Sequence, residues 1–201
     1  MGPPTFVDET GSSGIRQRYD GPDLYQGGGG VAVFDCNGDR MPDLYLAGGQ
    51  RPAALYRNRS ALGGSLRFER VPSPTTDLSN VTGAYPLDID GDGNVDLVVL
   101  RIGETVLLRG HGDCTFERAN EMLGFTGVDG YATAFSATWE GAASLPTLAI
   151  GRYLKLDGHG EPTFPCDEGA LLRANTNGSS SGTSTPLAPG YCAPSTLSRS
   201  W

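Results

Sequence analysis

A nine-residue acidic pattern occurs twice in this chain and restricts its folding more than any other feature. Residues 35–43 (loop 1) read DCNGDRMPD and residues 88–96 (loop 2) read DIDGDGNVD, with oxygen-bearing side chains at positions one, three, five and nine. Two like charges about 5 Å apart repel by roughly 3 kcal/mol at an effective dielectric constant near 20. A compact loop of this composition therefore needs a cation.

Calcium suits this pattern, because Ca²⁺ takes six to eight oxygens from carboxylates, amides, backbone carbonyls and water in a flexible shell. An EF-hand is excluded, since its twelfth position needs glutamate and helices must flank it, whereas Leu46 and Val99 stand there between predicted strands. Asp, Asn and Gly also favour simple turns, but the second copy argues against that alternative. The predicted ligands of two Ca²⁺ sites are Asp35, Asn37, Asp39, the Met41 carbonyl and Asp43 in loop 1, and Asp88, Asp90, Asp92, the Asn94 carbonyl and Asp96 in loop 2.

The composition predicts many short strands and little helix, given thirty glycines and fourteen prolines among 201 residues. A formal net charge of −8 and a pI near 4.7 argue against nucleic acid and anionic membranes as partners. No run of eighteen apolar residues occurs, so no membrane insertion is expected. The start, MGPPTFVDET, lacks the basic and apolar regions of a signal peptide, which is therefore expected to be absent or already removed.

The four cysteines, at positions 36, 114, 166 and 192, predict disulfides. None forms a CxxC pair, which argues against zinc or thioredoxin-type chemistry. Cys166 and Cys192 bracket a long polar insertion and form a plausible bridge, and Cys36 with Cys114 would follow by elimination. The sequence itself leaves the connectivity open.

Aligning the two loops brings their surroundings into phase, which identifies a repeat of about 50 residues with four short strands. A third copy starts at AFSATW (134–139) but has Trp139, Gly141, Ala143 and Thr147 at the ligand positions, so no metal is expected there. These features predict an all-β fold, a partial β-propeller of about three four-stranded blades. The expected segments are an N-terminal closing strand and linker (1–26), blade repeats one (27–80), two (81–127) and three with its insertion (128–193), and the start of a fourth (194–201).

The residues GGGVAVFDCNGDRMPDLYLAGG and LYRN resemble the FG-GAP/VCBS repeat family, whose calcium-binding blades also occur in integrin alpha-subunit propellers. Within that family they are most similar to the group of cartilage acidic protein and the UnbV/ASPIC-type proteins. The resemblance implies a secreted or cell-surface propeller, periplasmic or secreted in a bacterium, in which calcium is structural. The third repeat departs from the family pattern, so a metal in every blade is not expected.

The function expected from these features is non-enzymatic, namely calcium-stabilised presentation of loops to an extracellular protein or glycan, together with the remaining blades of the parent propeller. No catalytic residue is predicted, because nucleophilic catalysis needs a base beside the nucleophile and the two available histidines, His111 and His159, lie in glycine-rich turns. The alternative is the scaffold of a larger hydrolase or lyase whose catalytic residues lie outside this chain. Calcium could also act as a regulator, although ambient extracellular calcium favours a resident, structural ion.

Three further patterns also lead to expectations. QGGGGVAVF lacks a Walker motif and precedes a predicted strand, so we interpret it as an entry segment that allows close backbone approach. An arginine recurs in phase near the end of the third strand of each repeat, and salt bridges between blades would explain it. The three arginines are Arg57, Arg109 and Arg173, and N-glycosylation sequons stand at Asn58, Asn80 and Asn177.

Overall fold

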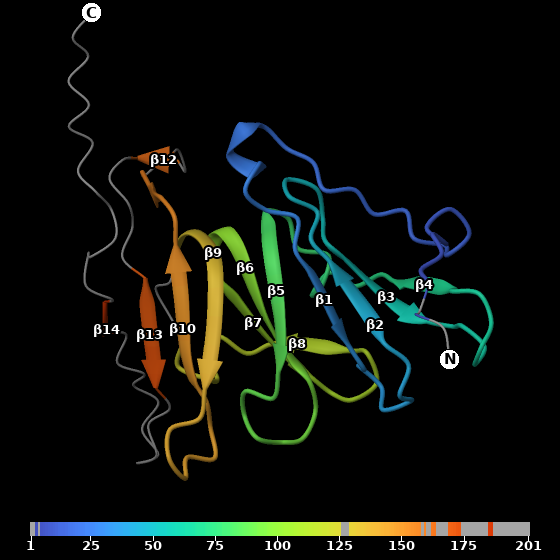
Figure 1. The fold of residues 1–201 in the computed structure, drawn as a ribbon. Helices are drawn as coiled ribbons and strands as arrows, with labels where there is room; N and C mark the ends of the chain where they lie inside the picture. The colour runs from blue at the N-terminus through green and yellow to red at the C-terminus, as the bar shows by residue number, and fades with distance from the viewer. Residues whose placement is uncertain are drawn as a thin grey trace, which may run out of the picture.

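Three groups of antiparallel strands follow one another along the chain (Figure 1). The structure is a computed structural model that describes residues 3, 5–125, 129–157, 159, 162–163, 169–173 and 185–186. Blade 1 has the strand order β1-β2-β3-β4. Its strands are β1 (Val31–Phe34), β2 (Asp43–Leu46), β3 (Ala54–Asn58) and β4 (Phe68–Val71).

Blades 2 and 3 repeat this meander, which confirms the all-β prediction and is consistent with part of a propeller. Blade 2 consists of β5 (Val81–Leu87), β6 (Asp96–Glu104), β7 (Val106–Gly110) and β8 (Phe116–Arg118). Blade 3 consists of β9 (Asp129–Thr138), β10 (Thr147–Arg152), β13 (Ala170–Arg173) and β14 (Thr185–Pro186), with a hairpin of β11 (Lys155–Leu156) and β12 (Pro162–Thr163) inserted. Within the described ranges, the helical turn η1 (Asp23–Tyr25) is far too short to cross a membrane, and no longer apolar helix occurs.

Strand β6 joins blades 2 and 3 into one sheet, a feature that the repeat pattern did not predict. Its first part pairs with β5 and β7, and its last pairing with β7 joins Val99 to Val106. The end of β6 runs beyond β7 and pairs instead with the start of β9, where Ile102 lies opposite Tyr131. The extra length of β6 therefore fixes the position of blade 3 against blade 2.

Blade 2 is packed on both faces, because side chains alternate along its strands. Leu97 and Val99 enter a buried cluster shared with blade 1, whereas Val98 and Leu100 enter a second cluster shared with blade 3. All four side chains are fully buried. Burying one such side chain contributes about 1.5–3 kcal/mol, so these two clusters hold the three blades together.

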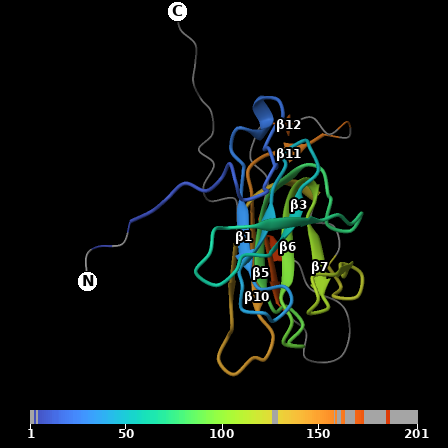
Figure 2. The ribbon, with the colours of Figure 1, turned by 90° about the vertical axis from the view of Figure 1, so that its right-hand side faces the viewer.

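The N-terminal segment crosses blade 1 without forming a strand. Ser13 accepts a hydrogen bond from the Phe68 backbone N–H (2.7 Å), and the Arg16 N–H donates to the Tyr56 hydroxyl (3.2 Å). Residues 5–10, within the expected N-terminal closing segment (1–26), have no strand pairing and are drawn without an arrow in Figure 2. Phe6 in this segment is 97% exposed. The described sheets offer this segment no partner, so its role in closing a ring stays a prediction.

Candidate metal centre

The two acidic loops lie at the same end of neighbouring blades. Loop 1 connects β1 to β2 and loop 2 connects β5 to β6, so the ninth residue of each loop is the first residue of a strand. Both loops turn through left-handed backbone at their fourth and sixth positions. These positions hold Gly38 (φ 73°) and Arg40 (φ 64°) in loop 1, and Gly91 (φ 79°) and Gly93 (φ 87°) in loop 2. This conformation favours glycine and explains three of the four residues.

The first aspartate of each loop caps the turn that follows it. The Asp35 carboxylate accepts the backbone N–H groups of Gly38 (2.8 Å) and Arg40 (2.7 Å). Asp88 likewise accepts those of Gly91 (2.7 Å) and Gly93 (3.0 Å). Both loops are therefore closed by the same hydrogen bonds.

The ninth residue of each loop is a buried aspartate with a second task that its place in the ligand pattern did not reveal. Asp43 is 0% exposed and accepts the N–H groups of Cys36 (2.9 Å) and Asn58 (2.8 Å). Asp96, 1% exposed, accepts those of Ile89 and Gly110 (2.8 and 2.9 Å). Burial raises the pKa of both carboxyls. Each ninth aspartate therefore ties its loop to the end of the third strand of its own blade.

Loop 2 brings its carboxylates together in a way that fits a hard cation. Oxygens of Asp88, Asp90 and Asp96 all lie within 4.8 Å of one another, a separation that one Ca²⁺ with ligands at 2.3–2.6 Å can bridge. Asp92 lies beside this group, and its carboxylate accepts the backbone N–H of Asn94 (2.8 Å), which lowers its pKa. That bond holds the Asn94 backbone in the loop, whereas the role of its carbonyl as a ligand stays a prediction.

Loop 1 brings its side chains together less completely. The Asn37 amide donates to the Asp39 carboxylate (2.9 Å) and lowers its pKa, and Asp39 also accepts the Met41 N–H (2.8 Å). Within the described part of the chain, the carboxylates of Asp35, Asp39 and Asp43 do not form a group as close as that of loop 2. Loop 1 carries one carboxylate fewer, which weakens the need for a cation.

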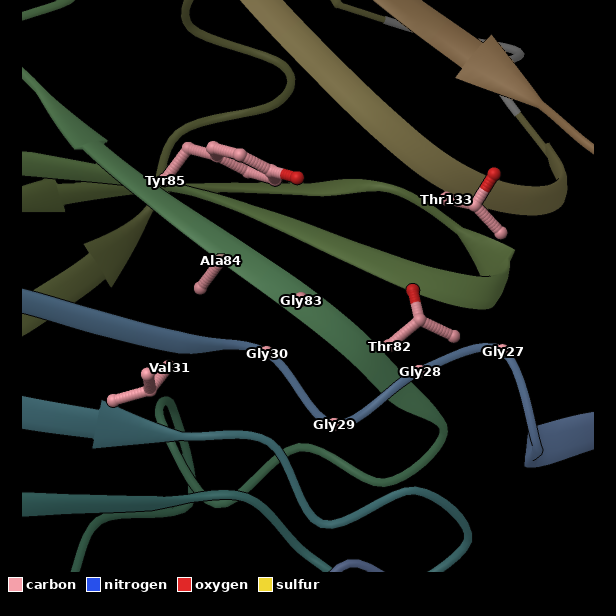
Figure 3. A pocket seen from close by; sticks show the side chains of 10 residues that line it. All are labelled: Gly27, Gly28, Gly29, Gly30, Val31, Thr82, Gly83, Ala84, Tyr85 and Thr133. Carbon is pink, nitrogen blue, oxygen red and sulfur yellow. The ribbon is translucent and has the colours of Figure 1, made fainter.

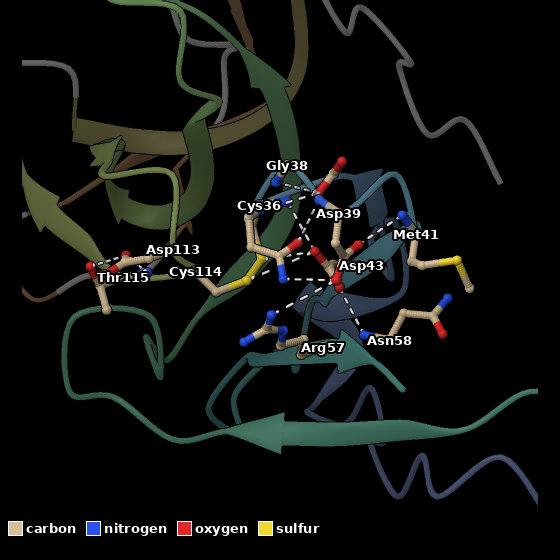
Figure 4. Close-up of a disulfide and its surroundings, with 12 residues drawn as sticks. Cys36, Gly38, Asp39, Met41, Asp43, Arg57, Asn58, Asp113, Cys114 and Thr115 are labelled. Atoms are coloured by element: carbon tan, nitrogen blue, oxygen red, sulfur yellow. Dashed lines mark hydrogen bonds and ion pairs between the residues drawn. A yellow bond between two sulfur atoms is a disulfide. The ribbon is translucent and has the colours of Figure 1, made fainter. Parts of the chain in front are cut away.

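A disulfide between Cys36 and Cys114 fastens loop 1 to blade 2 (Figure 4). The two Cα atoms are 4.7 Å apart, and the Cys114 N–H donates to the Cys36 carbonyl (2.9 Å). An Asp43 oxygen lies 2.9 Å from the Cys36 sulfur, and the bond occupies both sulfurs. The Cys36–Cys114 pairing inferred by elimination is confirmed, whereas Cys166 and Cys192 lie outside the described residues.

The recurring arginines form salt bridges within each blade, which corrects the prediction that they bridge neighbouring blades. Arg109, near the end of β7, donates from Nε to Asp90 (2.6 Å) and from Nη2 to Asp92 (2.8 Å). Arg57, in the same place on β3, has its Nη2 atom 3.8 Å from Asp39 (Figure 4). In an antiparallel meander the third strand ends beside the loop between the first two strands, so its last side chains face that loop.

The third repeat has a charge pair at the corresponding place. Glu140 of loop 3 (residues 139–147) accepts two hydrogen bonds from Arg173 on β13, at 2.8 and 2.6 Å. The same carboxylate accepts the Thr147 hydroxyl (2.5 Å), while Trp139 at the first loop position is 50% exposed. The arginine lowers the pKa of Glu140. Loop 3 is thus closed by an ion pair at the place where the other loops carry their ligand pattern.

A cavity of about 340 Å³ lies where β5 passes the glycine segment of residues 27–30 (Figure 3). The polar side chains of its lining are those of Thr82, Tyr85 and Thr133. The lining contains no carboxylate, histidine, lysine or arginine. The Gly30 N–H donates to the Thr82 carbonyl (3.2 Å), and a Cβ atom at Gly30 would lie 2.8 Å from the Gly83 Cα. The segment therefore allows close backbone approach and leads into a strand, as its sequence predicted.

The sequon at Asn58 is closed to glycosylation in the folded chain, because Asn58 is buried and its amide donates to the Pro42 carbonyl (3.0 Å). The Asn80 side chain accepts the Tyr25 hydroxyl (2.7 Å), and Asn177 lies outside the described residues. Of the two histidines, His111 and His159, neither touches the acidic loops through a hydrogen bond or ion pair that the structure records.

Comparison with known proteins agrees with this geometry. Residues 35–99, which contain both acidic loops, match the FG-GAP-like repeat family. Over 126 residues, 58% of the chain, the sequence is 31% identical to cartilage acidic protein 1 of Mus musculus and 30% identical to cartilage acidic protein 1 of Homo sapiens. The matched region spans 18% of the length of each relative. The resemblance inferred from the residues is confirmed, and the chain carries an FG-GAP-like repeat.

Proposed function

We propose that this chain is a calcium-binding β-propeller module of an extracellular or cell-surface protein, in which calcium is structural and the surrounding loops bind a protein or a glycan. One observation carries the proposal: the same acidic loop is built twice, at the same end of two neighbouring blades, and in loop 2 three carboxylates converge within 4.8 Å. The FG-GAP-like match across both loops and the likeness to cartilage acidic protein 1 support an extracellular setting.

Bound calcium would supply a divalent charge that offsets the repulsion between the loop carboxylates. In loop 2 the ligands come from both sides of a turn, because Asp88 follows the end of β5 and Asp96 begins β6. The backbone bonds to Asp88 hold this turn in shape, and the bonds from Ile89 and Gly110 hold Asp96 in place. An ion held at both ends of the turn would cross-link two strands of one blade, which is a structural task.

Calorimetric titration of CaCl₂ into metal-stripped protein tests the metal assignment. We expect two equivalents to bind, and Asp90→Ala with Asp92→Ala to remove the equivalent of loop 2. A matched control, Asp23→Ala with Glu121→Ala, removes two exposed carboxylates outside the loops and should leave two. If the loop variant still binds as many ions as the original chain, the ligand assignment is wrong.

Thermal melts in excess calcium and in chelator test the structural role. A resident structural ion raises the melting temperature, because a ligand that binds only the folded state stabilises it by mass action. Extracellular modules bind calcium at about 10⁻⁴–10⁻³ M, so the titration must reach millimolar concentrations. No binding in that range would contradict a resident structural calcium ion in this chain.

The non-enzymatic role and the partner class are tested separately. The chain covers a small part of its relatives, so the experiment belongs with the full-length protein. We expect immobilised protein to bind an extracellular matrix protein or a glycan from a defined panel, and to release it in chelator. Hydrolysis or elimination of a glycan, lost in a Tyr85→Phe variant of the cavity as well as in chelator, would favour the enzyme scaffold instead.

A further inference from the structure

Arg109 occupies the acidic side of loop 2 in a way that its counterparts in the other blades do not. Its Nε atom lies 2.6 Å from one oxygen of Asp90, and its Nη2 atom lies 2.8 Å from one oxygen of Asp92. The second oxygen of each carboxylate accepts a backbone N–H, from Asp92 (3.1 Å) and Asn94 (2.8 Å) respectively. Every oxygen of these two carboxylates therefore already has a hydrogen-bond donor.

The arginine also supplies charge where loop 2 needs it. Four carboxylates lie within nine residues, and the hydrogen bond to Asp90 holds the Arg109 pKa above its ordinary value. A guanidinium bonded to two carboxylates offsets part of their mutual repulsion and fixes their positions. A metal ion bound by the same carboxylates supplies the same two effects, so the arginine and the metal perform one task.

The other two blades support this equivalence. Loop 1 has Asn37 where loop 2 has Asp90, and there Arg57 stays 3.8 Å from its acidic neighbour without a hydrogen bond. Loop 3 lacks the ligand pattern, and Arg173 bonds both oxygens of Glu140. Loop 3 thus shows an arginine–carboxylate pair closing a loop that lacks the ligand pattern, and loop 2 alone combines the full pattern with a closely bonded arginine.

We propose that Arg109 is an internal counter-cation of loop 2, which holds Asp90 and Asp92 in the metal-free chain and competes with a divalent cation for them. This inference rests on the proposed calcium function of the same loop. Two consequences follow. Calcium binds loop 2 more weakly than its carboxylates alone would allow, and the metal-free loop stays ordered because the arginine takes the place of the ion.

Arg109→Met tests the inference, with Asp39→Ala added to all chains so that calorimetry reads loop 2 alone. We expect CaCl₂ to bind Arg109→Met about tenfold more tightly than the parent, because the competing charge-assisted bonds are gone. The melting temperature in chelator should fall at the same time. Arg118→Met is the matched control, since Arg118 pairs with Glu104 in the same blade and away from the loop, and both values should stay those of the parent.

Each outcome has one meaning. Unchanged or weaker binding in Arg109→Met, while the parent binds one ion, overturns the counter-cation and shows that Arg109 only positions the ligands. An equal gain in calcium affinity in Arg118→Met would show that only the net charge of the chain matters, and it would also overturn the counter-cation. If neither the parent nor Arg109→Met binds calcium, the proposed function fails, whereas binding by Arg109→Met alone supports the inference most strongly.

Discussion

Removing the Cys36–Cys114 disulfide should destabilise the chain strongly, because this bond joins two blades. The bond spans 78 residues and joins blade 1 to blade 2. For a closed loop of that length, the chain-entropy relation gives about 4.5 kcal/mol of stabilisation at 25 °C, and removal of native disulfides costs about 2–5 kcal/mol in practice. We therefore expect Cys36→Ala with Cys114→Ala to lose about 3–4.5 kcal/mol of unfolding free energy.

Urea unfolding in chelator, followed by fluorescence, measures this loss. With a slope of about 2 kcal/mol per molar urea for a domain of this size, the midpoint should fall by about 2 M. Cys114→Ala alone is the control: it loses the same cross-link but leaves the Cys36 thiol, whose sulfur lies 2.9 Å from Asp43, free to donate to that carboxylate. Its midpoint should lie slightly above that of the double variant. A midpoint shift below about 0.5 M in the double variant would refute the cross-link argument.

Three further perturbations test the packing and the charges. Gly30→Ala places a Cβ atom 2.8 Å from the Gly83 Cα and should lower the free energy of unfolding in urea by about 1–3 kcal/mol. In the control Gly83→Ala the new Cβ atom meets no atom closer than 3.7 Å, so stability should change by less than about 0.5 kcal/mol. Equal losses in the two variants would contradict the close approach. Arg173 lowers the pKa of Glu140 in the folded chain, so the stability from this pair is present above the ordinary pKa of glutamate and is lost as the pH falls through the lowered value. Thermal melts at decreasing pH should therefore show a smaller loss of stability in Glu140→Gln than in the original chain. An unchanged pH profile would contradict this reasoning. Asp96→Asn should cost about 1–3 kcal/mol even in chelator, because one of two buried N–H donors loses its acceptor, and a loss seen only with calcium would show that this residue acts through the metal alone.

The sequence predicted the repeat and its loops well, because both depend on local spacing. Apolar residues alternate along the strands, and glycines recur at the turns at fixed intervals. Gly38 and Gly91 have the left-handed backbone that such turns need. The pairing of β6 with β9 was not predictable, since it depends on how far one strand runs beyond its neighbour. The fold class can be predicted from the spacing of apolar residues and glycines, whereas the contacts between blades depend on strand lengths that this spacing does not specify.

The charge partners were harder to predict than the ligand pattern. The recurrence of Arg57, Arg109 and Arg173 indicated a salt bridge, but only the meander shows that each arginine faces the loop of its own blade. The double role of Asp43 was missed for a similar reason. Its backbone donor at Asn58 is fifteen residues away, and no local pattern connects the two.

The second position of each loop links the metal pattern to the contact between blades. Cys36 follows the first predicted ligand of loop 1 and forms the disulfide to blade 2, and Ile89 follows the first predicted ligand of loop 2 and packs into the cluster shared with blade 3. Glu140 stands at the same place in loop 3 and pairs with Arg173 of its own blade. In the two loops that carry the ligand pattern, a side chain next to a ligand therefore holds the next blade. An ion that fixes the backbone of these loops would stabilise the interfaces as well as the turns, which makes the contacts between blades the place to look for the effect of calcium.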